Sequence, residues 1–253
     1  MTTAQLFDQY VLGNYGRFPI AIERGEDGHV WDETGKQYLD FGTGIAVCSL
    51  GHSPAVMQEA IRQQAAELIH CSNLYQIRPQ AELARFVVDT KHQLPGKVFF
   101  CNSGAEANDA LIKLARKFAY DAHGASAGKN EIVTCTNSFH GRTLGGIAAT
   151  GQEKVKVGFD PMLPGFLHVP FNDSATLRAA VSEKTAAILF ERGAWLRDSV
   201  VDFRLDRSGR ATTARGLLDP ALMARPMAAG RSLLRPRWRY WKSLRMSTHS
   251  TMS

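Results

Sequence analysis

Three small residues, Ser103, Gly104 and Ala105, stand where an apolar run gives way to the pattern of a helix. Apolar side chains then recur at three- and four-residue spacing, at Ala107, Leu111, Leu114 and Phe118. This spacing predicts a helix that begins near Ser103. The first N–H groups of a helix have no acceptor within it, and small side chains leave them open to a phosphate. The residue types therefore predict an anion site on the N–H groups of Gly104 and Ala105.

The same segment also fits an interpretation that needs no ligand. Ser103 and Glu106 have the S-x-x-E spacing of a capping box, in which the two side chains satisfy N–H groups of the first turn. Spacing alone favours this interpretation, so the anion site depends on support from the rest of the chain.

The elements that would position this helix alternate between strands and helices. Short strands are predicted at 20–24 and 29–31, around a turn at Glu26-Asp27-Gly28. Further helices are predicted at 54–70, 79–94 and 174–182, and further strands at 97–101, 131–135, 166–169 and 186–191. The alternation is typical of an α/β fold whose mostly parallel sheet carries helices on both faces and binds ligands at the carboxyl ends of its strands.

A second polar segment follows the predicted strand at 131–135, and so lies at the same edge of the predicted sheet. It reads Ser138-Phe139-His140-Gly141-Arg142-Thr143. Together with Asn102–Asn108, residues 30–41 (VWDETGKQYLDF), 44–47 (GIAV) and 50–52 (LGH), it resembles the class-III pyridoxal-phosphate-dependent aminotransferases. The resemblance covers about residues 1–191.

The resemblance implies a fold-type-I aminotransferase, with a small-lobe segment in residues 1–50 and part of the cofactor-binding large domain in residues 51–191. Within the family it is greatest to members that exchange an amino group between N-acetylornithine and 2-oxoglutarate in arginine biosynthesis. The substrates would be an amino acid and a 2-oxo acid, and the family works as a homodimer. The cofactor would be pyridoxal 5′-phosphate.

The resemblance also implies residue roles. Four residues would bind the cofactor: Ser103, Gly104, Ala105 and Phe139. Phe139 would stack on the face of the cofactor ring, and Arg142 would form a bidentate salt bridge with a substrate carboxylate. His140 and Glu191 would support the site. Without the resemblance, Phe139 is assigned to core packing, Arg142 to the surface and His140 to a structural role.

The resemblance stops at Glu191, and the composition changes there. Residues 192–253 hold 12 Arg, 1 Lys and 4 Asp, a net charge of +9, whereas the preceding residues carry −3. We hypothesise that this basic, irregular tail arose by a frameshift or rearrangement near codon 192. A competing hypothesis is a nucleic-acid-binding or membrane-surface tail, since basic and aromatic residues interleave at 235–242. Prolines and the absence of a sustained pattern make nucleic-acid binding the weaker interpretation.

In the family, the Schiff-base lysine and the aspartate on the ring nitrogen come from segments beyond this point. The only lysine after Lys184 is Lys242, whose surroundings match no family motif. No catalytic residue is therefore predicted, and the chain is expected to be an inactive, truncated or frameshifted form. The alternative is a non-catalytic protein that binds phosphate-bearing ligands or pairs with a full-length relative.

The remaining features indicate a cytoplasmic protein. The first ten residues lack the pattern of a signal peptide, and no apolar run approaches the length that spans a membrane. The four cysteines, Cys48, Cys71, Cys101 and Cys135, have no C-x-x-C spacing, which favours buried thiols over a disulfide framework or a metal site.

Overall fold

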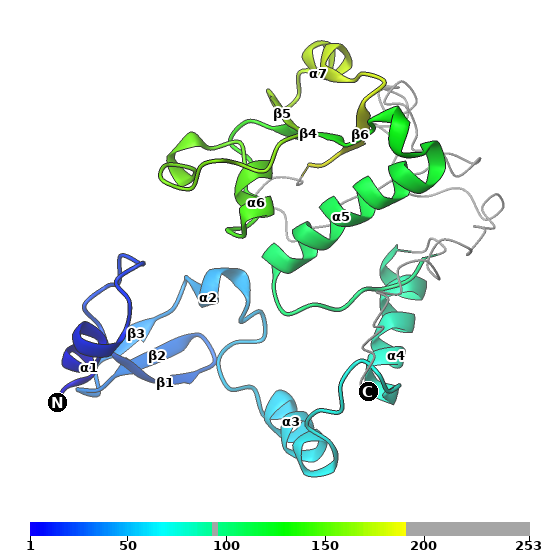
Figure 1. Ribbon diagram of the computed structural model, residues 1–253. Helices are drawn as coiled ribbons and strands as arrows, with labels where there is room; N and C mark the ends of the chain where they lie inside the picture. The colour runs from blue at the N-terminus through cyan, green and yellow to red at the C-terminus, as the bar shows by residue number, and fades with distance from the viewer. Residues whose placement is uncertain (93–95, 191–253) are drawn as a thin grey trace, which may run out of the picture. The chain divides into compact units, whose positions relative to one another are not determined.

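A computed structural model describes residues 1–92 and 96–190, which form two compact units (Figure 1). The first unit is Met1–Gln80, and the second begins at Ala81. The predicted small-lobe segment lies inside the first unit, and its boundary at residue 50 stays a prediction. Glu191 and the predicted tail, 192–253, lie outside the described residues.

The first unit is built on a three-stranded antiparallel sheet. Its strands β1 (Ile22–Glu26), β2 (His29–Asp32) and β3 (Gln37–Leu39) pair in chain order. The pairing of Glu26 with His29 closes the hairpin at the predicted turn, where Asp27 has φ 48°. β1 begins and ends two residues later than predicted. β3 was not predicted, because three residues are too few for an alternating pattern.

Four helices belong to this part of the chain: α1 (Thr3–Tyr10), α2 (Thr43–Ala46), α3 (Ala55–Glu67) and α4 (Arg78–Phe86). α4 crosses the boundary between the units and continues as a π-helical segment, Val87–His92. The helices predicted at 54–70 and 79–94 are thus confirmed over shorter spans.

The second unit contains the predicted parallel sheet. β4 (Glu131–Cys135) is the central strand, with β5 (Phe166–Val169) on one side and β6 (Thr185–Ile188) on the other. β4 and β5 have the predicted bounds, and β6 is shorter than predicted. The central position of β4 explains why its residues Ile132, Val133 and Thr134 are all buried.

Helices cover this sheet on both faces, as predicted. Figure 1 shows α5 (Gly104–His123) and α7 (Ser174–Ala180) on opposite sides of it. α6 (Leu144–Ala149) contacts α5. The core of the unit consists of Ile112, Ala115, Ile132, Ala149 and Leu189. None of the helices in the described ranges is both long enough and apolar enough to cross a bilayer.

The structure corrects the predicted buried face of α5. Of the four predicted apolar positions only Phe118 is buried, and the other buried residues are Ile112, Ala115 and Ala119. The helix turns this face to the sheet, and Arg116 donates a hydrogen bond to the carbonyl oxygen of Asn130. Leu111 and Leu114 are therefore only half-buried.

The predicted strand at 97–101 is wrong. The structure shows no strand there, and none of its backbone groups joins a ladder with another described residue. A strand needs a hydrogen-bonded neighbour, so an apolar run of this length does not by itself form one.

Candidate functional site

The first turn of α5 is capped by its own side chains. The Ser103 hydroxyl oxygen accepts a hydrogen bond from the Glu106 N–H at 3.2 Å. The Glu106 carboxylate accepts one from the Asn102 N–H at 2.6 Å, one residue before the position that a standard capping box uses. The interpretation as a cap is therefore confirmed at Ser103, while Glu106 holds the residue that leads into the helix.

Capping leaves two N–H groups of this turn available. Within the described ranges, the N–H groups of Gly104 and Ala105 have no hydrogen-bond acceptor. A Cβ built on Gly104 would meet no atom within 4 Å, so the space beside this residue is open. Because α5 is 20 residues long, its dipole adds positive potential at this end. The predicted anion site thus has free donors and room for a ligand.

The loop after β4 packs against the same turn. Gly141 has φ +99°, and a Cβ at this position would lie 2.7 Å from the Ala105 Cβ and 2.8 Å from its Cα. Only glycine permits both the left-handed backbone and this close approach. The segment Ser138–Thr143 and the start of α5 therefore meet. The predicted reason for this contact was a strand end before each segment, which holds for Ser138–Thr143 after β4 but not for α5, because residues 97–101 form no strand.

Two side chains near Gly141, those of Phe139 and Arg142, are exposed. Phe139 is 48% exposed, and the Arg142 guanidinium carbon lies 6.0 Å from the centre of its ring. Arg142 is exposed and forms no ion pair with another described residue. An exposed aromatic ring and an available guanidinium thus stand next to the residue that contacts Ala105. The assignment of Phe139 to core packing does not fit this exposure.

His140, in contrast, is buried, with 1% of its surface exposed. Its N–H donates to the Thr150 hydroxyl oxygen at 2.9 Å, and its ring Nδ1 lies 3.2 Å from the Asn108 side-chain oxygen. Burial, assisted by the nearby His168, lowers the pKa of His140 to about 4. The imidazole is therefore neutral at physiological pH, which fits a supporting residue better than a proton carrier.

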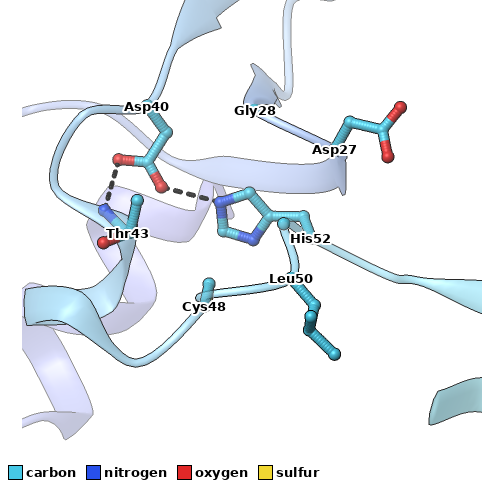
Figure 2. A pocket seen from close by; sticks show the side chains of 8 residues that line it. Asp27, Gly28, Asp40, Thr43, Cys48, Leu50 and His52 are labelled. Carbon is cyan, nitrogen blue, oxygen red and sulfur yellow. Dashed lines mark hydrogen bonds and ion pairs between the residues drawn. The ribbon is translucent and has the colours of Figure 1, made fainter.

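A hollow of about 340 Å³ lies in the first unit (Figure 2). Beside it, the Asp40 carboxylate binds the His52 Nε2 at 2.7 Å and accepts the Thr43 N–H at 3.0 Å. These contacts hold a bend in which Thr43 and Ile45 have φ 44° and 60°. Such backbone strain at non-glycine residues is concentrated at functional sites.

Four of the residues that line this hollow, Asp40, Leu50, Gly51 and His52, belong to two of the segments that carry the family resemblance, 30–41 and 50–52. The Asp40–His52 pair itself was not predicted. Its members are separated by 12 residues and lie outside the helices and strands, so no spacing rule reveals them. A motif-by-motif comparison is the only sequence signal that could have identified the region.

Together, the α5 turn and the 138–143 loop fit a ligand with an anionic group at one end and a flat ring at the other. The N–H groups of Gly104 and Ala105 suit the anion, and the exposed ring of Phe139 suits the flat face. Arg142 suits a second, carboxylate-bearing molecule. Glu191 lies outside the described residues, so its predicted role stays a prediction.

Comparison with known proteins points in the same direction. A family model described as "Aminotransferase class-III" matches residues 10–193. The acetylornithine aminotransferase of Nostoc sp. (strain PCC 7120) is 51% identical over 191 residues, which cover 73% of this chain and 44% of the Nostoc protein. The chain spans about half the length of the curated relatives it matches.

Solved structures resemble the same part of the chain. The ornithine aminotransferase of Toxoplasma gondii ME49 matches with a TM-score of 0.69 and 28% identity, over 74% of this chain and 44% of that one. The taurine:2-oxoglutarate aminotransferase of Bifidobacterium kashiwanohense, solved in complex with PLP and glutamate, matches with a TM-score of 0.62 and 28% identity. That match covers 74% of this chain and 47% of the other.

Proposed function

The chain belongs to the class-III aminotransferase family, and on this premise we propose that its described part binds pyridoxal 5′-phosphate for amino-group exchange between N-acetylornithine and 2-oxoglutarate. Pyridoxal phosphate is the cofactor of the family, whose members act on amino acids and 2-oxo acids. Support for N-acetylornithine as the amino donor comes from relatives named acetylornithine aminotransferase, which are 51% identical to this chain over the matched residues. Assembly as a homodimer in the cytoplasm belongs to the same proposal.

The single observation that carries the proposal is the contact between Gly141 and Ala105. It joins the turn that suits a phosphate to the loop that suits a ring. In the proposed site, the N–H groups of Gly104 and Ala105 bind the phosphate, and Phe139 covers one face of the ring. Ser103 contributes by holding the first turn in its capped form.

Pyridoxal phosphate, when bound, supplies the electron sink for amino-group exchange. Arg142 then orients the substrate, because its planar guanidinium offers two parallel donors to one carboxylate. Burial of His140 excludes water from the back of the loop. These residues bind and orient, and no lysine or aspartate of this site has been assigned to proton transfer.

We propose accordingly that this chain, acting alone, holds the cofactor without covalent attachment and has little or no turnover. The family match ends at residue 193, before the segments that carry the Schiff-base lysine and the ring-nitrogen aspartate in the family. A non-catalytic role in ligand binding, or pairing with a full-length relative, is the alternative. Nucleic-acid binding through residues 192–253 is the weaker one.

The test is a titration of the full chain with pyridoxal phosphate, using Gly104→Pro as the variant. Gly104 is the first helical residue, where proline removes one N–H and leaves the helix intact, and the extended backbone of Ser103 accepts a following proline. Loss of one hydrogen bond to a charged group is expected to weaken binding by roughly 10- to 100-fold.

Ser174→Pro is the matched control, because it removes the same N–H at the start of α7. It should bind pyridoxal phosphate as the wild type does. Borohydride treatment followed by mass spectrometry reports covalent attachment, and an assay with N-acetylornithine and 2-oxoglutarate reports turnover. Equal affinity of the wild type and Gly104→Pro would refute the assignment of the phosphate to this turn. Covalent attachment would refute the proposal that the chain alone is inactive.

A further inference from the structure

A line of hydrogen bonds connects the α5 turn to the loop through the half-buried side chain of Asn108 and the buried side chain of His140. The Asn108 amide nitrogen donates to the Gly104 carbonyl oxygen at 3.1 Å, which directs the amide oxygen of Asn108 toward His140. That oxygen lies 3.2 Å from the His140 Nδ1. Because an amide oxygen only accepts, the imidazole must carry its proton on Nδ1. The Nε2 atom is then a bare acceptor, and it is buried with no partner among the described residues.

A second link lies one residue further along α5 and three residues further along the loop. The Thr143 hydroxyl donates to the Asp109 carboxylate at 2.9 Å and accepts the Gly146 N–H at 3.0 Å. A Cβ on Gly145 would lie 2.5 Å from the same carboxylate oxygen, so the fit is close. Two adjacent residues of α5 thus hold two loop residues that bracket Gly141 and Arg142.

We propose that His140 is a positioning residue, which as the Nδ1–H tautomer binds Asn108 and, with the Thr143–Asp109 contact, fixes Phe139 and Arg142 relative to the amides of Gly104 and Ala105. The identity of the ligand rests on the proposed function, whereas the link itself does not. The two links make the anion turn and the ring-binding loop one preformed unit. Preformed geometry strengthens binding of a ligand that touches both parts, because less order must be created on binding.

The surroundings of His140 support the neutral tautomer. Burial lowers its pKa, and His168 of β5 acts in the same direction. Burial and the charge of Lys156 lower the pKa of His168 in turn, while Glu153 acts on that pKa in the opposite direction. A neutral ring with one proton can satisfy Asn108 and leave Nε2 bare, whereas a charged ring would bury a second, unpaired donor.

The experiment compares His140→Asn with His140→Leu in the full chain. The side-chain nitrogen of asparagine occupies nearly the same place as Nδ1 and can still donate to Asn108, whereas leucine keeps the bulk and donates nothing. We expect His140→Leu to bind pyridoxal phosphate at least about tenfold more weakly than the wild type, and His140→Asn to remain within about threefold. Inorganic phosphate, which touches only the turn, should lose less affinity than pyridoxal phosphate. His123→Leu, at the exposed end of α5, is the matched control and should change neither affinity.

Two measurements without ligand test the link on its own. The ¹⁵N NMR spectrum of the wild type should show His140 protonated at Nδ1. The N–H groups of Gly146 and Gly151 donate to the loop side chains of Thr143 and Ser138. Their amide hydrogen exchange should be about tenfold faster in His140→Leu than in His123→Leu, with His140→Asn close to the wild type. If His140→Leu does not fold, Asn108→Leu removes the same hydrogen bond from the other side and takes its place.

Outcomes for the link and for the proposed function are separable. An Nε2–H tautomer, unchanged exchange in His140→Leu, or equal losses in His140→Asn and His140→Leu would overturn the positioning role, whatever the ligand. If the wild type binds neither pyridoxal phosphate nor inorganic phosphate, the proposed function fails. The tautomer and the exchange rates then decide the positioning role alone.

Discussion

The Arg116 guanidinium donates a hydrogen bond to the carbonyl oxygen of Pro164, 48 residues away, at 2.5 Å. It also binds the Asn130 carbonyl at 3.2 Å and lies over the Phe166 ring. One side chain therefore ties α5 to the segments that enter β4 and β5.

Replacement of Arg116 by Met should lower the free energy of unfolding by about 1–3 kcal/mol, because it leaves two carbonyl oxygens without their donor. Thermal or urea unfolding followed by circular dichroism measures this loss. Lys113→Met, at an exposed position on the same helix, should be neutral by comparison. An equal effect of both changes would mean that the arginine contacts contribute nothing to stability.

Gly141→Ala should weaken pyridoxal-phosphate binding and destabilise the second unit, because the new Cβ would overlap Ala105. Gly158→Ala separates this overlap from backbone strain, since Gly158 has φ +86° and open space around it. Both variants carry the cost of a left-handed alanine, about 1–2 kcal/mol. Only Gly141→Ala should also lose affinity in the titration, and similar behaviour of the two variants would contradict the role of the Gly141–Ala105 contact.

Acid should destabilise the protein through His140. Because its pKa is about 4 in the folded chain and 6.5 ordinarily, the unfolded chain takes up the proton first as pH falls. The contribution of His140 is thus complete above pH 6.5 and is lost between about pH 6.5 and 4. The pKa difference corresponds to about 3 kcal/mol.

Unfolding measured at several pH values in the wild type and in His140→Asn isolates this contribution, because His168 titrates in both proteins. As the pH falls toward 4, the wild type should lose more free energy of unfolding than His140→Asn does. A difference independent of pH would show that His140 keeps its ordinary pKa.

The Asp40 carboxylate should titrate below its ordinary range, chiefly because His52 binds it and secondarily because it accepts the Thr43 N–H. A lowered pKa means that Asp40 stabilises the fold above its ordinary pKa of 3.8 and loses that contribution as pH falls. In His52→Ala the pKa of Asp40 should rise, as followed by ¹³C NMR of the carboxyl carbon. Asp173, whose pKa is lowered by Thr176 at the start of α7, serves as the internal control and should not move.

The sequence predicted best those elements whose own residues determine their form. β4 and β5 have the predicted bounds, because each is a short run rich in apolar residues. β4 is also the central strand of the described sheet and is buried on both faces. The start of α5 was predicted within one residue from the cap at Ser103. The contact of the two polar segments was predicted from a common place after strands, but only Ser138–Thr143 follows a strand, because residues 97–101 do not form one.

The features that escaped prediction depend on distant partners. The buried face of α5, formed by Ile112, Ala115, Phe118 and Ala119, lies beside the predicted stripe, and apolar spacing alone does not decide between two neighbouring apolar stripes. The run at 97–101 has the composition of a strand but pairs with no other strand in the described ranges. The Asp40–His52 pair and the Asn108–His140 link join residues 12 and 32 positions apart, and only the folded chain brings them together.

The strand order β5–β4–β6 also determines the order in which the strands can pair during synthesis. During synthesis β4 and β5 emerge and can pair through the short α6 segment, whereas β6 follows only after α7. Until then one side of β4, the most buried strand of the unit, presents unpaired backbone groups beside Ile132 and Val133. The nascent chain thus passes through an interval in which the unpaired edge of β4 can pair with other chains. The rate at which α7 and β6 dock determines how long that interval lasts.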